Sequence, residues 1–190
     1  MEIKEEKRAL RRHCRELRDA LENAYFAAAD ETITRALLSL KAWREAESVF
    51  LYVSLPGEPD TRALIRAGLE AGKAVYVPLC GPGGSMRAMR LRDPDALRPG
   101  LHGIPEPYGE GEALDGAPDL CVVPCVCADA SGGRLGHGAG FYDRYLAAHP
   151  CPTVCLCYAR LLQPSIPCEE SDVRMDAVLT EKSLSKKENF

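Results

Sequence analysis

The chain has 190 residues, of which 46% are apolar and 27% are charged, and its formal net charge is -4. This composition is typical of one folded globular domain over 1–190, and it excludes disordered, collagen-like and coiled-coil chains. The sequence contains no apolar run near the roughly 20 residues of a membrane helix and begins without an export signal, so we expect a cytoplasmic protein. The slight negative charge argues against broad binding to nucleic acid or anionic membrane.

Nine cysteines are present, an odd number for a disulfide framework. In a chain of this size without an export signal, they are predicted to be mostly reduced, buried thiols. A zinc or redox site is the alternative for the cysteines of two later segments, which are Cys121, Cys125, Cys127, Cys155 and Cys157. The C-x-C spacing lacks the paired C-x-x-C pattern of structural zinc sites and favours small apolar core residues.

Two helices are predicted at the start of the chain. From Lys4 to Tyr25, apolar residues recur at steps of three and four, as on one face of an amphipathic helix. That stripe consists of Leu10, Cys14, Leu17, Leu21 and Ala24. The other face is basic and carries Lys4, Lys7, Arg8, Arg11, Arg12, Arg15 and Arg18. Such a face is most often only solvated. The second helix is expected over 27–40.

Strands and helices then alternate. Short apolar and β-branched runs bounded by Pro or Gly predict strands at 48–54, 73–79, 119–124 and 153–158, with shorter candidates at 86–91 and 177–180. Helices are expected over 61–71 and 140–148. This alternation indicates an α/β sandwich with a mostly parallel sheet, in which ligands bind beyond the carboxyl ends of the strands. The Gly- and Pro-rich stretch 81–116 is either a lid or a surface decoration.

The segment 132–146, GGRLGHGAGFYDRYL, carries the strongest chemical signal. Its glycines let the backbone approach a ligand closely, and the following helix offers free N–H groups to an anion. It is neither a Walker A loop nor a dinucleotide fingerprint. The loop therefore suits a phosphate, and a purely structural turn is the alternative.

Charged side chains in and after this loop extend the phosphate hypothesis. Arg134 and His137 can donate to phosphate oxygens, and Asp143 in the first helical turn can hold Mg²⁺. The alternative for Asp143 is simple complementarity to the helix dipole. Asp172 and Asp176 are further acidic candidates, although acids in such a position are usually surface charges.

A series of motifs in a fixed order then points to a family. The motifs are KRALRRHCRELR, FLYVSLPGEPDT, GKAVYVPL, HGIPEP, DLCVVP, GRLGHGAGFYDRYL and IPCEESDVRMDAVLT. Over about Lys7 to Thr180 the chain resembles 5-formyltetrahydrofolate cyclo-ligases, also called 5,10-methenyltetrahydrofolate synthetases. The resemblance implies a three-layer α/β sandwich with helices on both faces of a mostly parallel central sheet.

The resemblance also implies a reaction. It is the ATP- and Mg²⁺-dependent conversion of 5-formyltetrahydrofolate to 5,10-methenyltetrahydrofolate, with release of ADP and phosphate. The formyl oxygen would attack the γ-phosphate of ATP to give an N5-iminium phosphate, and N10 would then close the ring as phosphate leaves. The partner is a small folate, with or without a polyglutamate tail. The oligomeric state stays open, and a monomer is plausible.

Individual residues receive roles from the same resemblance. ATP would be bound by Lys7, Arg11, Arg134, Leu135, Gly136, His137, Gly138, Ala139, Gly140, Phe141 and Tyr142, of which Arg134 and Tyr142 would be catalytic. The folate would contact Val53, Glu58, His137, Gly138, Ala139, Gly140 and Phe141. Mg²⁺ would be held by Asp143 and Asp172. We hypothesise that Glu58 orients the pterin by accepting hydrogen bonds.

Two departures from the family pattern concern the loop. The family often has basic residues where this chain has His137 and Ala139, and the aromatic pair is Phe141 and Tyr142 instead of two tyrosines. The alanine puts nucleotide affinity in question, but not the reaction type.

Two other functions stay open at this point. One is a non-catalytic regulatory module that binds a nucleotide or a phosphorylated metabolite through the same loop. The other is RNA binding through the basic first helix, which the negative net charge and the few aromatic residues disfavour.

Overall fold

The computed structural model describes residues 2–100, 103, 105–107, 111–187 and 190. Within this part of the chain, a seven-stranded sheet has the order β12-β11-β9-β6-β1-β2-β3. The strands are β1 (Ser48–Leu51), β2 (Ala74–Cys80), β3 (Met86–Arg90), β6 (Leu120–Val123), β9 (Thr153–Leu156), β11 (Ala177–Leu179) and β12 (Leu184–Lys186). Neighbouring strands from β11 to β2 pair in parallel, and the edge strands β12 and β3 are antiparallel. The mostly parallel sheet is therefore confirmed.

The middle of the sheet is apolar on both faces. In β1 the side chains of Val49, Phe50 and Leu51 are fully buried, and all four residues of β6 are buried as well. Strands covered on both faces have continuous apolar runs instead of an alternating pattern, which is why these runs predicted buried strands. Burying a side chain of this size contributes about 1.5–3 kcal/mol, so these strands anchor the core.

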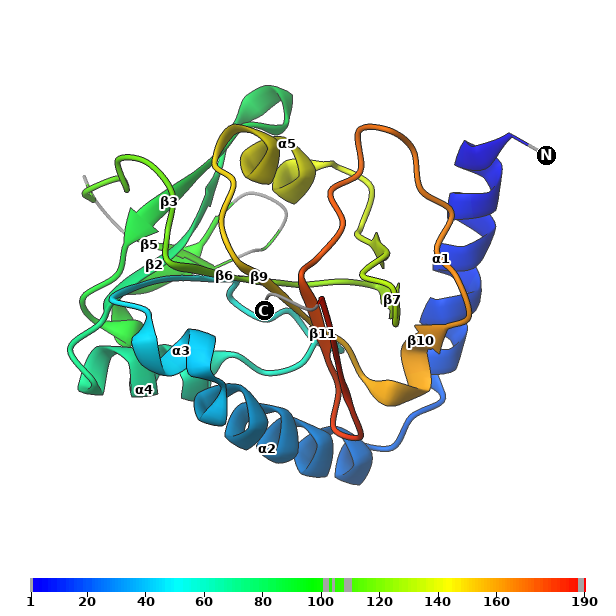
Figure 1. The fold of residues 1–190 in the computed structure, drawn as a ribbon, viewed down its shortest axis with the longest axis horizontal. Helices are drawn as coiled ribbons and strands as arrows, with labels where there is room; N and C mark the ends of the chain where they lie inside the picture. Colours follow the sequence, from blue (N-terminus) through cyan, green and yellow to red (C-terminus); the bar gives the residue numbers. More distant parts are fainter. Residues whose placement is uncertain (1, 101–102, 104, 108–110, 188–189) are drawn as a thin grey trace.

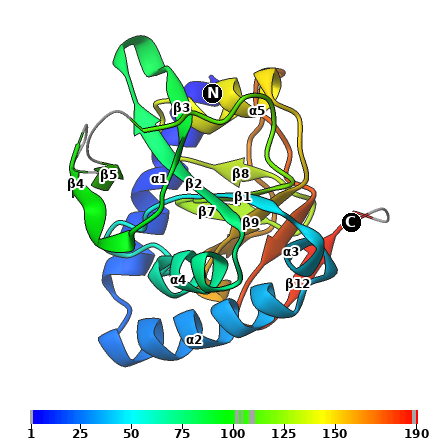
Figure 2. The ribbon, with the colours of Figure 1, turned by 90° about the vertical axis from the view of Figure 1, so that its left-hand side faces the viewer.

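Helices lie on both faces of the sheet, as Figure 1 shows. The helices α2 (Asn23–Ser39), α3 (Lys41–Glu45) and α4 (Arg62–Glu70) cover one face, and α5 (Phe141–Ala148) covers the other. The three-layer α/β arrangement is therefore confirmed. Figure 2 shows α2 and α4 together below the sheet in that view.

The first helix is shorter than its periodicity predicted. The helix α1 (Ile3–Asp19) ends before a turn, and α2 already begins at Asn23, so the predicted boundaries at 25 and 27 are wrong. Of the predicted apolar stripe, Cys14 is fully buried, whereas Leu17 is 37% exposed. The predicted stripe ran past the end of α1 because Leu21 and Ala24, at and beyond the turn, are also apolar and keep the same spacing.

Several short strands were not predicted. A three-stranded sheet has the order β10-β7-β8, formed by β10 (Leu162–Gln163), β7 (Cys127–Asp129) and β8 (Arg134–Leu135). It lies between the large sheet and α1 (Figure 1). Strands of two or three residues are too short to show a periodic pattern, so sequence could not reveal them.

The irregular segment 81–116 contains a second small sheet. Its strands β4 (Leu97–Pro99) and β5 (Pro105–Pro107) pair antiparallel. Glu106 of β5 accepts a hydrogen bond from the Cys80 N–H at the end of β2, at 3.1 Å. Parts of this segment, including residues 102 and 104 of the HGIPEP motif, lie outside the described residues.

All nine cysteines lie in the described part of the chain, and they are free thiols. Six of them are buried, namely Cys14, Cys121, Cys125, Cys127, Cys155 and Cys157. The predicted burial is confirmed for most of the cysteines, and their reduced state stays a prediction. As for membrane spans, no helix in the described ranges combines enough length with enough apolar character to cross a bilayer. The cytoplasmic location stays a prediction.

Candidate functional site

The glycine-rich loop connects β8 to α5, where the sequence predicted a loop entering a helix. Gly138 has φ 108° and Gly140 has φ 67°, both in the left-handed region that favours glycine. Gly140 is the residue that precedes the first turn of α5, and the helix begins at Phe141. The N–H groups of that turn consequently face the loop and are available to an anion.

The helix α1 reaches this loop through Arg11. Its Nε donates a hydrogen bond to the Gly136 carbonyl oxygen at 2.8 Å. An open groove of about 450 Å³ lies beside this contact, lined by Arg8, Arg11, Arg12, Arg15, Glu16, Asp19 and His137. The basic face of α1 thus borders the loop, and is not only a solvated surface.

Lys7, one helical turn before Arg11, is buried and 7% exposed. Its Nζ donates to Glu169 Oε2 at 2.7 Å and to Asp172 Oδ2 at 2.5 Å. Burial opposes the charge of Lys7, but the hydrogen bonds to Asp172 and Glu169 outweigh it and raise the lysine pKa. Lys7 is therefore a buried cation next to the segment that carries Asp172.

Arg134 of β8 is a second buried cation. Its Nη2 donates to both oxygens of Asp143, at 2.8 and 2.9 Å. Asp143 also accepts a hydrogen bond from the Val173 N–H at 3.2 Å. Burial acts against the charge of Arg134, but the attraction of Asp143 prevails and raises the pKa of the guanidinium. Each of the two predicted metal ligands thus lies against one of the predicted phosphate-binding cations.

Tyr142 contributes a buried hydroxyl group to the same place. Its ring stacks on Phe50 with the centroids 6.0 Å apart, and the Arg134 guanidinium lies 5.9 Å from the ring centroid. Among the described residues, neither Tyr142 Oη nor Arg134 Nε has a hydrogen-bond partner. Burial raises the tyrosine pKa well above its ordinary value, so Oη keeps its proton. Two unpaired donors in a buried position are suited to a polar ligand.

Glu58 approaches the loop from the other side. It follows β1, is 8% exposed, and accepts the Leu55 N–H through Oε2 at 2.8 Å. Burial raises its pKa to about 7. His137 of the loop places Nε2 3.8 Å from Glu58 Oε1. Burial and the arginines of α1 lower the pKa of His137, so the two side chains meet at neutral pH without a fixed charge pair.

The predicted folate residues therefore come together in part. Glu58 and His137 are 79 positions apart in the chain and are neighbours in the structure. Val53 is buried and lies just beyond the carboxyl end of β1. Both segments are at the edge where an α/β sheet is expected to bind its ligand.

Arg144 lies in the segment 132–146, and sequence reasoning gave it no role. Its Nη2 donates to the Ala139 carbonyl oxygen, and its Nε donates to the Gly84 carbonyl oxygen at 3.0 Å. The side chain therefore ties the glycine-rich loop to the turn between β2 and β3. Arg144 is the fourth residue of α5. Side chains in the first turn of a helix point back over the preceding loop, so this position could have predicted the contact.

The two carboxylates offer the oxygen ligands that Mg²⁺ prefers. Mg²⁺ commonly takes one or two carboxylates and completes its coordination with water and phosphate oxygens. Across the ranges that the structure describes, no three His, Cys, Asp or Glu side chains are gathered to hold a metal ion. The donor chemistry of Asp143 and Asp172 thus fits a Mg²⁺ ion that arrives with phosphate oxygens, and not a preformed protein cage.

Comparisons with known proteins place the chain in one enzyme family. A model of the 5-formyltetrahydrofolate cyclo-ligase family matches residues 3–181. The chain is 30% identical to a probable 5-formyltetrahydrofolate cyclo-ligase of Caenorhabditis elegans. The match is 194 positions long and covers 94% of each chain. It is 35% identical to the 5-formyltetrahydrofolate cyclo-ligase of Mycolicibacterium smegmatis over 145 residues, or 71% of this chain and 74% of that one.

A solved structure supports the same assignment. It is the 5,10-methenyltetrahydrofolate synthetase of Aquifex aeolicus, with a TM-score of 0.84 and 30% sequence identity. The similarity covers 95% of this chain and 92% of that one. Sequence and fold thus point to one group of enzymes.

Proposed function

Since the chain belongs to the 5-formyltetrahydrofolate cyclo-ligase family and is a cyclo-ligase enzyme, we propose that it converts 5-formyltetrahydrofolate to 5,10-methenyltetrahydrofolate as ATP is converted to ADP and phosphate. One observation carries the proposal. The glycine-rich loop lies between buried cations on one side and a buried carboxylate on the other, so it can bring a phosphate and a folate into contact.

The phosphates of ATP bind at the loop and at α1 in this proposal. Main-chain N–H groups at the start of α5 and the half-buried guanidinium of Arg11 supply the hydrogen-bond donors. Lys7 and Arg134 add two buried positive charges, and Leu135 to Tyr142 form the wall of the site. Preorganised charges of this kind stabilise the charge that develops during phosphoryl transfer.

Mg²⁺ would be held by Asp143 and Asp172, and when bound it would neutralise negative charge on the phosphates. Both carboxylates are now paired with cations, so their affinity for Mg²⁺ depends on competition with Arg134 and Lys7. We expect the bound phosphates to favour this exchange, because they attract the same two cations.

The folate binds between Val53, Glu58 and the loop residues His137 to Phe141. In its ionised form, the Glu58 carboxylate can accept hydrogen bonds from the amino and ring N–H groups of the pterin. The chemistry requires the formyl oxygen to become a leaving group. It attacks the γ-phosphorus, the bond to ADP breaks, N10 then attacks the formyl carbon, and phosphate leaves as the N10 proton is released.

Arg134 and Tyr142 act on the transferred group. The unpaired Arg134 Nε and Tyr142 Oη are both buried donors, and each can hydrogen-bond to a phosphate oxygen. Burial strengthens such hydrogen bonds because water does not compete for the donors.

The absorbance of the product tests this function, since the methenyl product has a conjugated amidinium that the substrate lacks. Purified protein is mixed with 5-formyltetrahydrofolate, ATP and Mg²⁺, and each component is omitted in turn. Growth of the new band only in the complete mixture is expected. Nucleotide binding without the band would instead support the non-catalytic module.

A further inference from the structure

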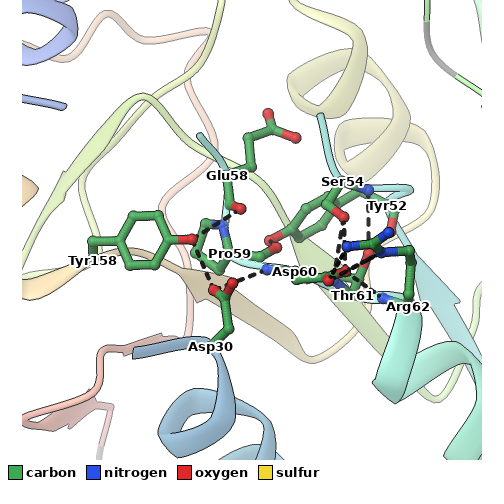
Figure 3. Close-up of polar contacts among 9 residues, drawn as sticks. All are labelled: Asp30, Tyr52, Ser54, Glu58, Pro59, Asp60, Thr61, Arg62 and Tyr158. Carbon is green, nitrogen blue, oxygen red and sulfur yellow. Dashed lines mark hydrogen bonds and ion pairs between the residues drawn. The ribbon is translucent and has the colours of Figure 1, made fainter. Parts of the chain in front are cut away.

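The segment that carries Glu58 is held by side chains of two distant elements and by Tyr52 at the start of its own loop. Figure 3 shows Tyr158, Asp30 and Tyr52 around the main chain of residues 58 to 60. Tyr158 follows β9, Asp30 lies on α2, and Tyr52 follows β1. Three separate parts of the fold therefore fix one short stretch of backbone.

Tyr158 is the central contact. Its hydroxyl lies 3.0 Å from the Glu58 carbonyl oxygen and 2.7 Å from Asp30 Oδ1, and the single phenolic proton is shared by these two acceptors. The residue is 1% exposed. A buried polar contact of this kind has no water to replace it if the hydroxyl is removed.

Asp30 holds the other end of the same stretch. Its Oδ1 also accepts the Asp60 N–H at 3.1 Å. Asp30 is therefore linked to Asp60 directly and to Glu58 through Tyr158. Tyr52 adds a third restraint, because its hydroxyl donates to the Pro59 carbonyl oxygen at 2.6 Å.

The Glu58 side chain leaves this held backbone in the other direction. In Figure 3 its carboxylate points away from Asp30 and Tyr158. The carboxylate lies on the side of His137, with Oε1 3.8 Å from the imidazole. Fixing the Glu58 main chain restricts where its carboxylate can lie, and the Leu55 N–H, 2.8 Å from Oε2, holds the carboxylate itself.

We propose that Tyr158 and Asp30 are positioning residues for folate binding, which act through the main chain of Glu58. This role rests on the proposed function, because it requires Glu58 to orient the folate. Neither residue touches the reacting atoms. Their contribution is to keep the carboxylate preorganised, which reduces the ordering cost of binding.

Tyr158→Phe is the sharpest variant, because it removes one oxygen and keeps the ring. The expected result is a rise of about tenfold in KM for 5-formyltetrahydrofolate, as expected for the loss of one buried hydrogen bond, with KM for ATP changed by less than about twofold. Asp30→Ala, a second variant, should move the same KM in the same direction. Circular dichroism and thermal unfolding establish that both variants are folded.

Tyr25→Phe is the matched control. The Tyr25 ring lies 5.8 Å from the Tyr158 ring, and its hydroxyl bonds Glu181 Oε1 at 2.7 Å instead of the Glu58 segment. It removes the same atom from the same aromatic cluster. Both KM values should therefore stay at the wild-type level in this variant.

A double-mutant cycle with Glu58→Gln separates positioning from a general loss of structure. If Tyr158 acts through Glu58, adding Tyr158→Phe to Glu58→Gln should raise KM for the folate by less than about twofold further. A full tenfold rise in that background, or a joint rise of both KM values, would overturn the role. If the wild-type enzyme is active and Tyr158→Phe has the same KM for the folate, this role alone is overturned. If the wild-type enzyme forms no product, the proposed function is overturned and this role with it.

Discussion

At the scale of single residues, Glu58 joins the two halves of the candidate site. Its carboxylate is buried, and burial raises the pKa of Glu58 to about 7. The pKa of the neighbouring His137 is lowered, so the imidazole is less readily protonated. A carboxyl group in this state destabilises the fold when it ionises, and such strained groups are common at functional sites. Two properties of the protein should therefore depend on Glu58.

The first is folate binding. We predict that Glu58→Gln raises KM for 5-formyltetrahydrofolate at least tenfold, because an amide oxygen is a weaker acceptor than a carboxylate. KM for ATP should change little. Steady-state kinetics with each substrate varied in turn measures both values, and an unchanged KM and kcat for the folate would remove Glu58 from the binding site.

The second is stability as a function of pH. The ordinary pKa is 4.5 and the folded pKa is about 7, so between these values the folded state binds more protons than the unfolded state. Stability therefore falls as pH rises through this window, by on the order of 3 kcal/mol in total. Glu58→Gln lacks this penalty. We predict that it is more stable than the wild type at pH 8 and that the difference vanishes near pH 4.5, as measured by urea unfolding; a difference independent of pH would contradict the assignment.

Asp143 is the residue whose loss should affect both metal use and folding. Asp143→Ala leaves the Arg134 guanidinium buried without its carboxylate, which costs on the order of 3 kcal/mol. We predict a lower thermal unfolding temperature and a higher Mg²⁺ concentration for half-maximal turnover. Normal turnover at low Mg²⁺ would show that Asp143 is not part of the metal site.

At the scale of elements, the glycine-rich loop and the turn that precedes β8 are attached to their surroundings at three points. Arg11 of α1 binds one carbonyl group, Arg144 of α5 binds another, and the main chain of Gly132 meets the segment around Met175. The loop is thus an ordered part of the structure, although it lies between short strands and a helix.

The Arg144 contact gives an element-scale prediction. Arg144→Ala should release Ala139 from the turn at Gly84 and raise KM for ATP by about fivefold, since the loop must then be ordered on binding. Arg66→Ala removes an exposed arginine of α4 and is the matched control. Equal KM values for ATP in the wild type and both variants would contradict a role for Arg144 in the loop.

The turn between β7 and β8, which precedes the glycine-rich loop, can be tested with a pair of glycines. An alanine Cβ at Gly132 would lie 2.4 Å from the Met175 carbonyl oxygen, whereas at Gly72 it would meet nothing within 4 Å; φ is positive at both positions. Gly72→Ala should therefore cost only about 1 kcal/mol of conformational energy. We predict that Gly132→Ala costs clearly more in chemical denaturation, and equal costs would argue against the close approach.

Sequence patterns predicted the central strands of the large sheet better than they predicted the short strands and side-chain contacts around it. The apolar runs around Phe50 and Val122 located central strands, because full burial leaves a continuous apolar stretch. The strand β1 ends at Leu51, three residues before the predicted end, because the chain turns away toward the Glu58 loop. The pairing of Lys7 with Asp172 depends on tertiary contacts across the whole chain, which residue spacing does not contain.

At the scale of the whole molecule, the fold brings three distant parts of the chain to one edge of the sheet. The helix α1 brings Lys7 and Arg11, the region from β8 to α5 brings Arg134 and His137, and the segment after β1 brings Glu58. An enzyme that transfers a phosphoryl group from ATP to the formyl oxygen before ring closure must bind ATP and the folate side by side. The central claim is therefore that one site couples both reactions.

The ratio of ADP to methenyl product tests this claim most directly. Both are measured in the same reaction of the wild-type enzyme with 5-formyltetrahydrofolate, ATP and Mg²⁺, the product by absorbance and ADP by chromatography. We predict about one ADP for each product formed, and no ADP above background when the folate is omitted. ADP release that continues at the same rate without the folate would contradict it.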